Sequence, residues 1–191
     1  MARMAQTGKF ADVISALQNL EQHDRQIVVL IDGPAGAGKT TLATEIKKNF
    51  ESVNVVHMDD LYDGWHSPLN PDLYSRIQKQ IIEPHLNQKV SEYAVYDWVL
   101  QEFSTHQVLP VKKILVVEGV GAAGAELRNS ADLIVFIEVP SEIGLNRVLS
   151  RDGDNLFTKM QAWQVMEFEY FQAEKTKKAA DFVIDGSLDL V

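Results

Sequence analysis

Short apolar runs separated by longer amphipathic segments form the basic pattern of this chain. Runs that favour β-strands occur at residues 27–31, 53–58, 114–117, 133–139 and 182–184. Between them, the spacing predicts helices over residues 40–50, 71–86, 141–151 and 158–178, with a kink at Pro84 in the second. Another amphipathic helix precedes the first strand, with apolar positions at Phe10, Val13, Ile14, Leu17 and Leu20. Strands that are apolar on both faces and alternate with helices predict an α/β fold with a mainly parallel, five-stranded sheet.

The eight residues GPAGAGKT follow the first apolar run and fit the phosphate-binding pattern GxxxxGK[ST]. Glycines let backbone amides turn inward around a polyphosphate, and the helix that follows adds the partial positive charge of its N-terminus. In this pattern the lysine reaches the β- and γ-phosphates, and the next hydroxyl binds Mg²⁺. The fold expected is therefore the three-layer α/β/α sandwich of a P-loop NTPase. The expected nucleotide-binding residues are Gly33, Pro34, Ala35, Gly36, Ala37, Gly38, Lys39, Thr40 and Thr41.

Carboxylates follow two of the other predicted strands. Ligands bind at the carboxyl ends of the strands in such sheets, so these groups should lie near the γ-phosphate. Asp59 is the expected general base for a hydroxyl acceptor, and Asp60 is the less favoured alternative. Glu118 is expected at the Mg²⁺ site with Thr40, acting through water. Acidic residues at strand ends also cap turns, and that structural alternative stays open here.

Composition narrows the class of protein. The chain has 191 residues, which suits one domain spanning residues 1–191, with an N-terminal helix inside residues 1–25. A net charge of −9 argues against a nucleic-acid partner, and the absence of cysteine excludes disulfides and thiol catalysis. No apolar stretch reaches the length of a membrane span, and the first ten residues lack the apolar core of a signal peptide, so we expect a cytoplasmic enzyme with no membrane partner. Association with further copies of the chain is left open.

Four sequence elements together resemble the uridine kinase branch of the P-loop nucleoside kinases. They are GPAGAGKT, then MDDLY, then the Tyr96-Asp97-Trp98 triplet, then VVEGV, in matching order over about residues 27–185. The resemblance implies transfer of the γ-phosphoryl group of ATP, or GTP, to a nucleoside 5′-hydroxyl with Mg²⁺. It implies acceptor binding by Tyr62, by Asp72 on the ribose hydroxyls, and by Tyr96 and Trp98 around the base. The alternative for the last two residues is ordinary packing in a hairpin.

Two departures from the family pattern affect substrate choice and the lid. Uridine kinases carry a histidine three residues after the aromatic residue that Trp98 replaces, and this chain has Gln101 there. Glutamine can still donate and accept hydrogen bonds to a base, so selectivity for uridine or cytidine is not implied. Arg147 and Arg151 share one face of a predicted helix and are expected to bind phosphates during catalysis. The small helical lid expected at about residues 151–160 has fewer arginines than the family pattern.

Three functions are consistent with these sequence features. The first is a kinase of a small-molecule hydroxyl acceptor, most simply a nucleoside. The second is a kinase of another metabolite, such as a sugar or a pantothenate-like compound, on the same scaffold. The third is a regulatory NTPase, which is disfavoured because the Asn-Lys-x-Asp and Asp-x-x-Gly elements of GTPase switches do not occur at suitable places.

Overall fold

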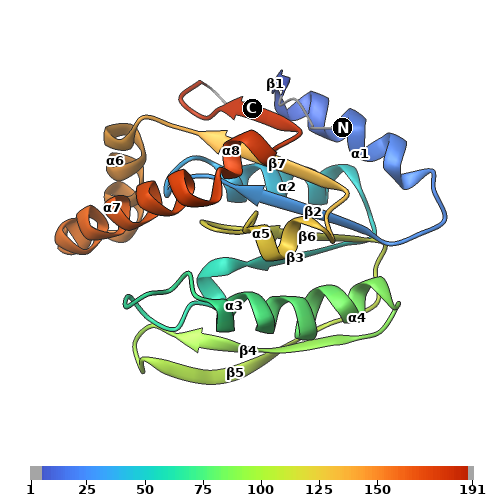
Figure 1. Cartoon of the computed structure of the whole chain (residues 1–191), viewed down its shortest axis with the longest axis horizontal. Helices are drawn as coiled ribbons and strands as arrows, with labels where there is room; N and C mark the ends of the chain where they lie inside the picture. The colour runs from blue at the N-terminus through green and yellow to red at the C-terminus, as the bar shows by residue number, and fades with distance from the viewer. Residues whose placement is uncertain (1–5, 189–191) are drawn as a thin grey trace.

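A six-stranded parallel sheet forms the centre of the protein. In the computed structural model, which describes residues 6–188, neighbouring strands of this sheet pair only in parallel (Figure 1). The α/β class predicted from the sequence is therefore confirmed. From one edge to the other, the strands are β1 (Gln6–Gly8), β8 (Phe182–Asp185), β7 (Leu133–Glu138), β2 (Ile27–Asp32), β6 (Ile114–Glu118) and β3 (Val53–His57).

The expected strand number of five is wrong by one. The additional strand is β1, which pairs with β8 at the edge of the sheet. Its three residues, Gln-Thr-Gly, form no apolar run, because the strand lies at the surface and only Gly8 is half-buried. Hydrophobic patterning could not reveal it.

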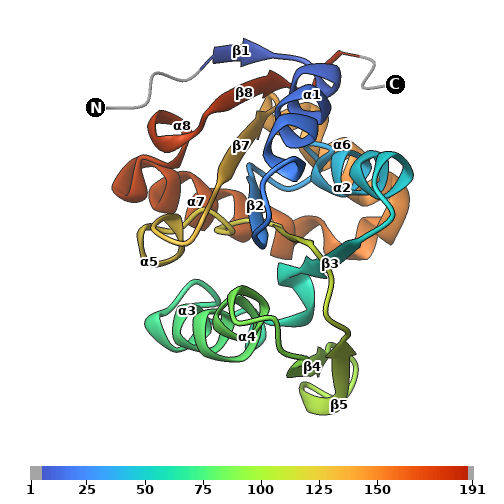
Figure 2. The same ribbon diagram turned by 90° about the vertical axis from the view of Figure 1, so that its right-hand side faces the viewer.

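Helices cover both faces of this sheet. Figure 2 shows α1 (Phe10–Glu21) and α2 (Lys39–Asn49) on one face, and α5 (Ala125–Arg128) and α7 (Phe157–Glu174) on the other. Alternate residues of the fully buried strand β2 enter the two cores, with Val28 on one side and Val29 on the other. The sheet is thus buried on both faces, as expected for parallel strands.

The helix predicted over residues 71–86 is present as one continuous run with an irregular middle. It consists of α3 (Pro71–Arg76), a π-helical segment η2 (Ile77–Ile82) and α4 (Glu83–Leu86). The Glu83 N–H donates to the carbonyl of Gln78, five residues earlier. Proline cannot donate an N–H and its ring crowds the preceding turn, so the widened turn just before Pro84 accommodates it.

A two-stranded antiparallel hairpin lies outside the main sheet, beside the α3–α4 run (Figure 1). Its strands, β4 (Ser91–Asp97) and β5 (Glu102–Leu109), were not predicted. Most of β5 is exposed, so its sequence lacks the regular alternation that indicates a half-buried strand. The hairpin ends in the turn that carries Trp98 and Gln101.

The remaining elements surround the end of the sheet where the site lies. They are the 3₁₀ turns η1 (Met58–Asp60) and η3 (Asp154–Leu156) and the helices α6 (Ser141–Asp152) and α8 (Thr176–Ala179). The helix expected over residues 158–178 is divided, because Lys175 has a left-handed conformation with φ 54° and separates α7 from α8. No helix within residues 6–188 combines the length and the apolar character needed to cross a bilayer.

Candidate active site

The P-loop connects β2 to α2 and lies against neighbouring backbone. A Cβ on Gly33 would stand 2.0 Å from the carbonyl oxygen of Ile137, and a Cβ on Gly36 would stand 2.3 Å from that of Gly144. Both glycines also have positive φ, at 139° and 74°. We expected glycine here so that a phosphate could approach the backbone. The structure adds a separate reason, which is that the protein's own backbone occupies the space beside these residues.

Lys39 begins helix α2 and turns back over the loop. Its Nζ donates to the carbonyl oxygens of Gly33 and Pro34, both at 2.8 Å. Gly38, with φ 99°, precedes the helix in a left-handed conformation. The first amides of α2 therefore follow directly on the glycine-rich turn, which is the arrangement that binds anions at a helix N-terminus.

Thr40 and Glu118 meet beside the P-loop. The Thr40 hydroxyl donates to Glu118 Oε1 at 2.8 Å, and His57 Nδ1 lies 2.6 Å from the same oxygen. Burial raises the pKa of Glu118. The contact with His57, the charge of Lys39 and the bond from Thr40 together lower it by more, so the pKa of Glu118 lies below the usual value. The same contact with Glu118 raises the pKa of His57. Glu118 is thus held as a carboxylate next to a hydroxyl, a pair of oxygen ligands suited to Mg²⁺.

The rest of the described chain supplies no larger metal site. Across residues 6–188, no cluster of three or more His, Asp or Glu side chains is placed to hold a metal ion. This is consistent with the way Mg²⁺ binds in nucleotide sites, where one or two protein oxygens act together with phosphates and water. The residues present therefore fit a phosphate-bound Mg²⁺ rather than a fully enclosed ion.

Asp59 lies in η1, directly after β3, and faces the P-loop. Its side chain is open to the cavity, yet the surrounding protein removes enough water to raise its pKa. Lys39 and Arg151 act in the opposite direction, while Glu118 adds to the increase. Burial also raises the pKa of the adjacent Asp60, but only Asp59 is among the residues that line the cavity described next.

The P-loop and Asp59 line the same cavity, which has a volume of about 740 Å³. Its wall brings together most of the predicted site from separate segments of the chain. The predicted residues on it are Ala35, Gly36, Ala37, Gly38, Lys39, Thr40, Thr41, Asp59, Tyr62, Trp98, Glu118, Arg147 and Arg151. The roles assigned to these residues stay predictions, but their shared location fits one site.

Three predicted acceptor residues are not part of this wall. Asp72 is exposed in the first turn of α3, and Gln101 is exposed in the hairpin turn with φ 57°. Tyr96 is buried and packs edge-to-face against Trp98 and Phe103, with both centroid distances at 5.2 Å. These three predicted acceptor residues therefore lie outside the lining, as do Gly33 and Pro34 at the start of the P-loop. Tyr96 has the packing contacts that the structural alternative proposed.

Both predicted arginines lie on the cavity, with different partners. Arg147 Nη1 donates to the carbonyl oxygens of Gly36 at 3.2 Å and Gly186 at 2.7 Å. Arg151 forms a two-point pair with the carboxylate of Asp152, at 2.7 and 2.6 Å. Arg147 is therefore tied to the P-loop backbone, whereas Arg151 is held at the end of α6, where it also acts on Asp59.

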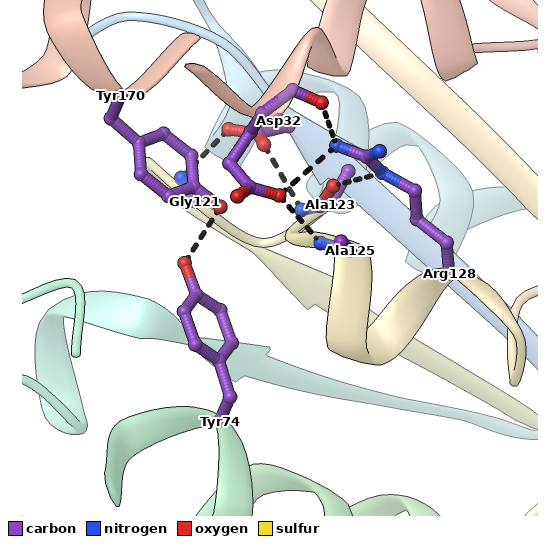
Figure 3. A network of polar contacts seen from close by, with 8 residues as sticks. Asp32, Tyr74, Gly121, Ala123, Ala125, Arg128 and Tyr170 are labelled. Atoms are coloured by element: carbon purple, nitrogen blue, oxygen red, sulfur yellow. Dashed lines mark hydrogen bonds and ion pairs between the residues drawn. The ribbon is translucent and has the colours of Figure 1, made fainter. Parts of the chain in front are cut away.

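A buried carboxylate that we did not predict connects the P-loop to the loop after β6. Asp32 is fully buried and accepts a backbone N–H bond from Gly33 at 2.7 Å. It also accepts N–H bonds from Gly121 at 2.8 Å and Ala123 at 3.0 Å (Figure 3). Burial raises the pKa of Asp32 to about 6, against the lowering effect of these bonds and of Lys39. An acidic residue at the end of an otherwise apolar strand was the signal that could have identified it.

A second buried carboxylate, Glu167, connects the P-loop to α7. Its Oε2 accepts from the Ala35 N–H at 3.0 Å and from the Trp163 indole N–H at 3.1 Å. Burial raises its pKa, and the two bonds and Lys39 partly offset that increase. The spacing predicted a helix over residues 158–178, but it could not show that a charged residue of this helix reaches the P-loop.

The fold and this geometry agree with comparisons to known proteins. The NB-ARC domain model matches residues 7–117, more than half of the chain, so the chain belongs to this family of P-loop NTPase domains. A uridine kinase from Chlamydia pneumoniae is 27% identical over 182 residues, covering 84% of this chain and 82% of that protein. One from Halalkalibacterium halodurans is 29% identical over 187 residues, covering 84% and 86%.

A solved structure shares the fold at low sequence identity. It comes from Bacillus stearothermophilus and is described as a possible uridine kinase. Its TM-score is 0.64 at 22% identity, and the match covers 92% of this chain and 99% of that one. Within the P-loop class, this protein resembles the uridine kinase-like branch, and the resemblance noted in the sequence is confirmed.

Proposed function

We propose that this protein transfers the γ-phosphoryl group of ATP, or of GTP, to the 5′-hydroxyl of a nucleoside. The observation that carries the proposal is the single cavity of about 740 Å³, whose wall contains both the P-loop and the carboxylate of Asp59. A phosphate cradle alone would serve any NTPase. A carboxylate facing that cradle suits a second substrate with a hydroxyl to be deprotonated. The relatives named as uridine kinases support a nucleoside as that substrate.

The chain's own residues divide the work of transfer. Asp59 takes the proton of the acceptor hydroxyl, and the freed oxygen bonds to the γ-phosphorus while the bond to the β–γ bridging oxygen breaks, so that a nucleoside diphosphate leaves. The raised pKa makes Asp59 a stronger base than an ordinary aspartate. The P-loop amides, Lys39 and Arg151 face the negative charge on the phosphates. Thr40 and Glu118 would hold Mg²⁺, which neutralises phosphate charge when bound.

A second candidate is a kinase of another hydroxyl-bearing metabolite. The position of Gln101 favours this second function. This residue replaces the family's histidine, and it is exposed in the hairpin turn rather than on the cavity wall. The contact expected to select uridine or cytidine is therefore not provided by this side chain.

The test is a screen for the phosphoryl acceptor. We expect the rate of ATP consumption with Mg²⁺ to rise strongly when a nucleoside is added, and mass spectrometry should show a nucleoside monophosphate. The Lys39→Ala control should lose roughly 3–4 kcal/mol of transition-state stabilisation, the scale for removing a preorganised donor. Stimulation by sugars alone would favour the second candidate. Equal hydrolysis with and without every acceptor would indicate a regulatory NTPase.

A further inference from the structure

All three tryptophans of the chain line the cavity. The Trp65 ring lies 5.1 Å from that of Trp98 and 5.8 Å from that of Trp163, measured between centroids. They come from three separate segments: the loop after η1, the hairpin turn and helix α7. We call these three residues the tryptophan cluster. Its rings are tilted or perpendicular to one another, at 59° and 87°, so they form a corner rather than a closed stack.

The polar groups of three aromatic side chains on this wall form hydrogen bonds within the protein. The Trp98 indole N–H donates to the Asp59 carbonyl at 3.0 Å, and the Trp163 indole N–H donates to Glu167 at 3.1 Å. The Tyr62 hydroxyl donates to the Val120 carbonyl at 2.7 Å. These side chains therefore offer ring surfaces to a ligand, while their hydrogen-bonding groups hold the wall in place.

Trp65 is the member of the cluster with the most accessible ring. It remains 38% exposed, whereas Trp163 is almost entirely buried at 7%. Lys159 of α7 lies over the Trp65 ring, 5.2 Å from its centroid, and also lines the cavity. The ring is thus oriented by Trp98, Trp163 and a cation, and its remaining surface is open to a planar ligand.

We propose that the tryptophan cluster, with Trp65 as its principal member, binds the ring of the acceptor through its faces, and that this subsite does not distinguish one nucleobase from another. This inference rests on the proposed nucleoside kinase function. It places base recognition at Trp65 and Trp163 instead of at Tyr96 and Gln101, which lie outside the cavity wall. Stacking on aromatic faces tolerates different bases because every base has a π-face.

The test measures binding separately from catalysis. Calorimetry on the full chain would give the Kd of uridine, cytidine, adenosine and guanosine, with ribose as the ligand that has no base. We expect Trp65→Ala to raise the Kd of all four nucleosides by about 10-fold or more, the scale of one lost base–aromatic stack. The four increases should agree within about 3-fold, and Trp65→Phe should recover most of the affinity. Ribose should bind weakly to every variant.

Two matched controls separate the subsite from general damage. Phe168→Ala removes an exposed aromatic ring from α7, away from the cavity, and Gln101→Ala removes the side chain at the family's histidine position. Both should leave nucleoside affinity within about 2-fold of wild type, well below the effect of a lost stack. Thermal unfolding of each variant checks that it is folded. In addition, quenching of tryptophan fluorescence reports occupancy directly, because every tryptophan lies on the cavity.

The outcomes separate failure of this inference from failure of the proposed function. If wild type phosphorylates nucleosides but Trp65→Ala binds them normally, the subsite is wrong and the kinase function stands. If Trp65→Ala weakens only one nucleoside, or Gln101→Ala weakens binding instead, recognition of the base edge replaces the proposed stacking. If nucleosides bind through Trp65 but are never phosphorylated, the subsite stands and the proposed function fails. If no nucleoside binds to wild type, the subsite is overturned as well.

Discussion

The two parts of the cavity wall that we propose for the phosphoryl donor and for the acceptor, called here the donor side and the acceptor side, are constructed in different ways. The donor side is mainly backbone from one continuous segment, residues 35–41. Close contacts of Gly33 with Ile137 and of Gly36 with Gly144 hold this loop. The acceptor side is mainly side chains from the loop after η1, the hairpin turn and α7. A site made of backbone amides binds a feature that all nucleoside triphosphates share. A site made of side chains can change its ligand by substitution while the fold stays the same.

Buried carboxylates join these two sides to the rest of the protein. On the donor side, Asp32 holds the start of the P-loop to the loop after β6 through three backbone N–H groups. Between the sides, Glu167 bonds both to the P-loop and to the tryptophan cluster, through Ala35 and Trp163. Variants can therefore alter one side at a time, and a variant of Glu167 can remove the contacts between the two sides.

The largest effect is expected from Asp59→Asn, which alters the acceptor side alone. Asparagine keeps the shape of the side chain but cannot take the hydroxyl proton. We expect kcat to fall by about 10²- to 10⁴-fold, the usual scale for loss of a general base, while calorimetry shows normal binding of Mg²⁺–ATP.

The matched control for this change is Asp60→Asn. Asp60 follows Asp59 in the same 3₁₀ turn but does not line the cavity, so its turnover should stay close to that of wild type. A greater loss in Asp60→Asn than in Asp59→Asn would transfer the role of base to Asp60. Normal turnover in both variants would remove the general base from the mechanism.

The same division explains what the sequence could predict. The P-loop could be predicted because its residues are consecutive and their spacing is fixed by phosphate geometry. The positions of Asp59 and Glu118 could be predicted because parallel strands bring their carboxyl ends to one edge of the sheet. Their positions on one cavity follow from local rules, although their chemical roles await the experiments above.

The acceptor side was less predictable because its geometry depends on contacts distant in sequence. Trp65 and Trp163 are 98 positions apart, and only the packing of α7 on the loop after η1 brings their rings together. The sequence predicted that Trp163 belongs to a helix, but not that its side chain lines a cavity. Residues assigned by family resemblance divide into two groups. Tyr62 and Trp98 line the wall, whereas Asp72 and Gln101 lie exposed outside it.

The second prediction concerns the donor side and is a pH effect on stability. Burial raises the pKa of Asp32 from 3.8 to about 6, so the folded state binds this proton more tightly than the unfolded state does. The contribution of Asp32 is then most favourable below pH 3.8 and is lost as the pH rises through 6. Relative to Asp32→Asn, which cannot titrate, wild type should lose about 2.4 kcal/mol of unfolding free energy between pH 4 and pH 7.

Denaturant unfolding of both proteins at four pH values between 4 and 7 measures this difference. Asp24→Asn, at an exposed position between α1 and β2, is the control, and its pH profile should follow that of wild type. A difference between wild type and Asp32→Asn that stays constant with pH would show that the three backbone N–H groups fully compensate the charge of Asp32. In that case the donor side would contain a stable carboxylate throughout this range.

The smallest effect is expected from separating the two sides at Glu167. In Glu167→Ala, the half-buried N–H of Ala35 and the buried indole N–H of Trp163 both lose their acceptor, and we expect the unfolding free energy to fall by about 1–3 kcal/mol. Glu167→Gln is the matched control, because its amide oxygen can accept both bonds while the charge is removed. If only the alanine variant is destabilised, the hydrogen bonds connect α7 to the P-loop. Equal losses in both variants would show instead that the negative charge facing Lys39 is the important property, and the two sides would then be coupled through electrostatics.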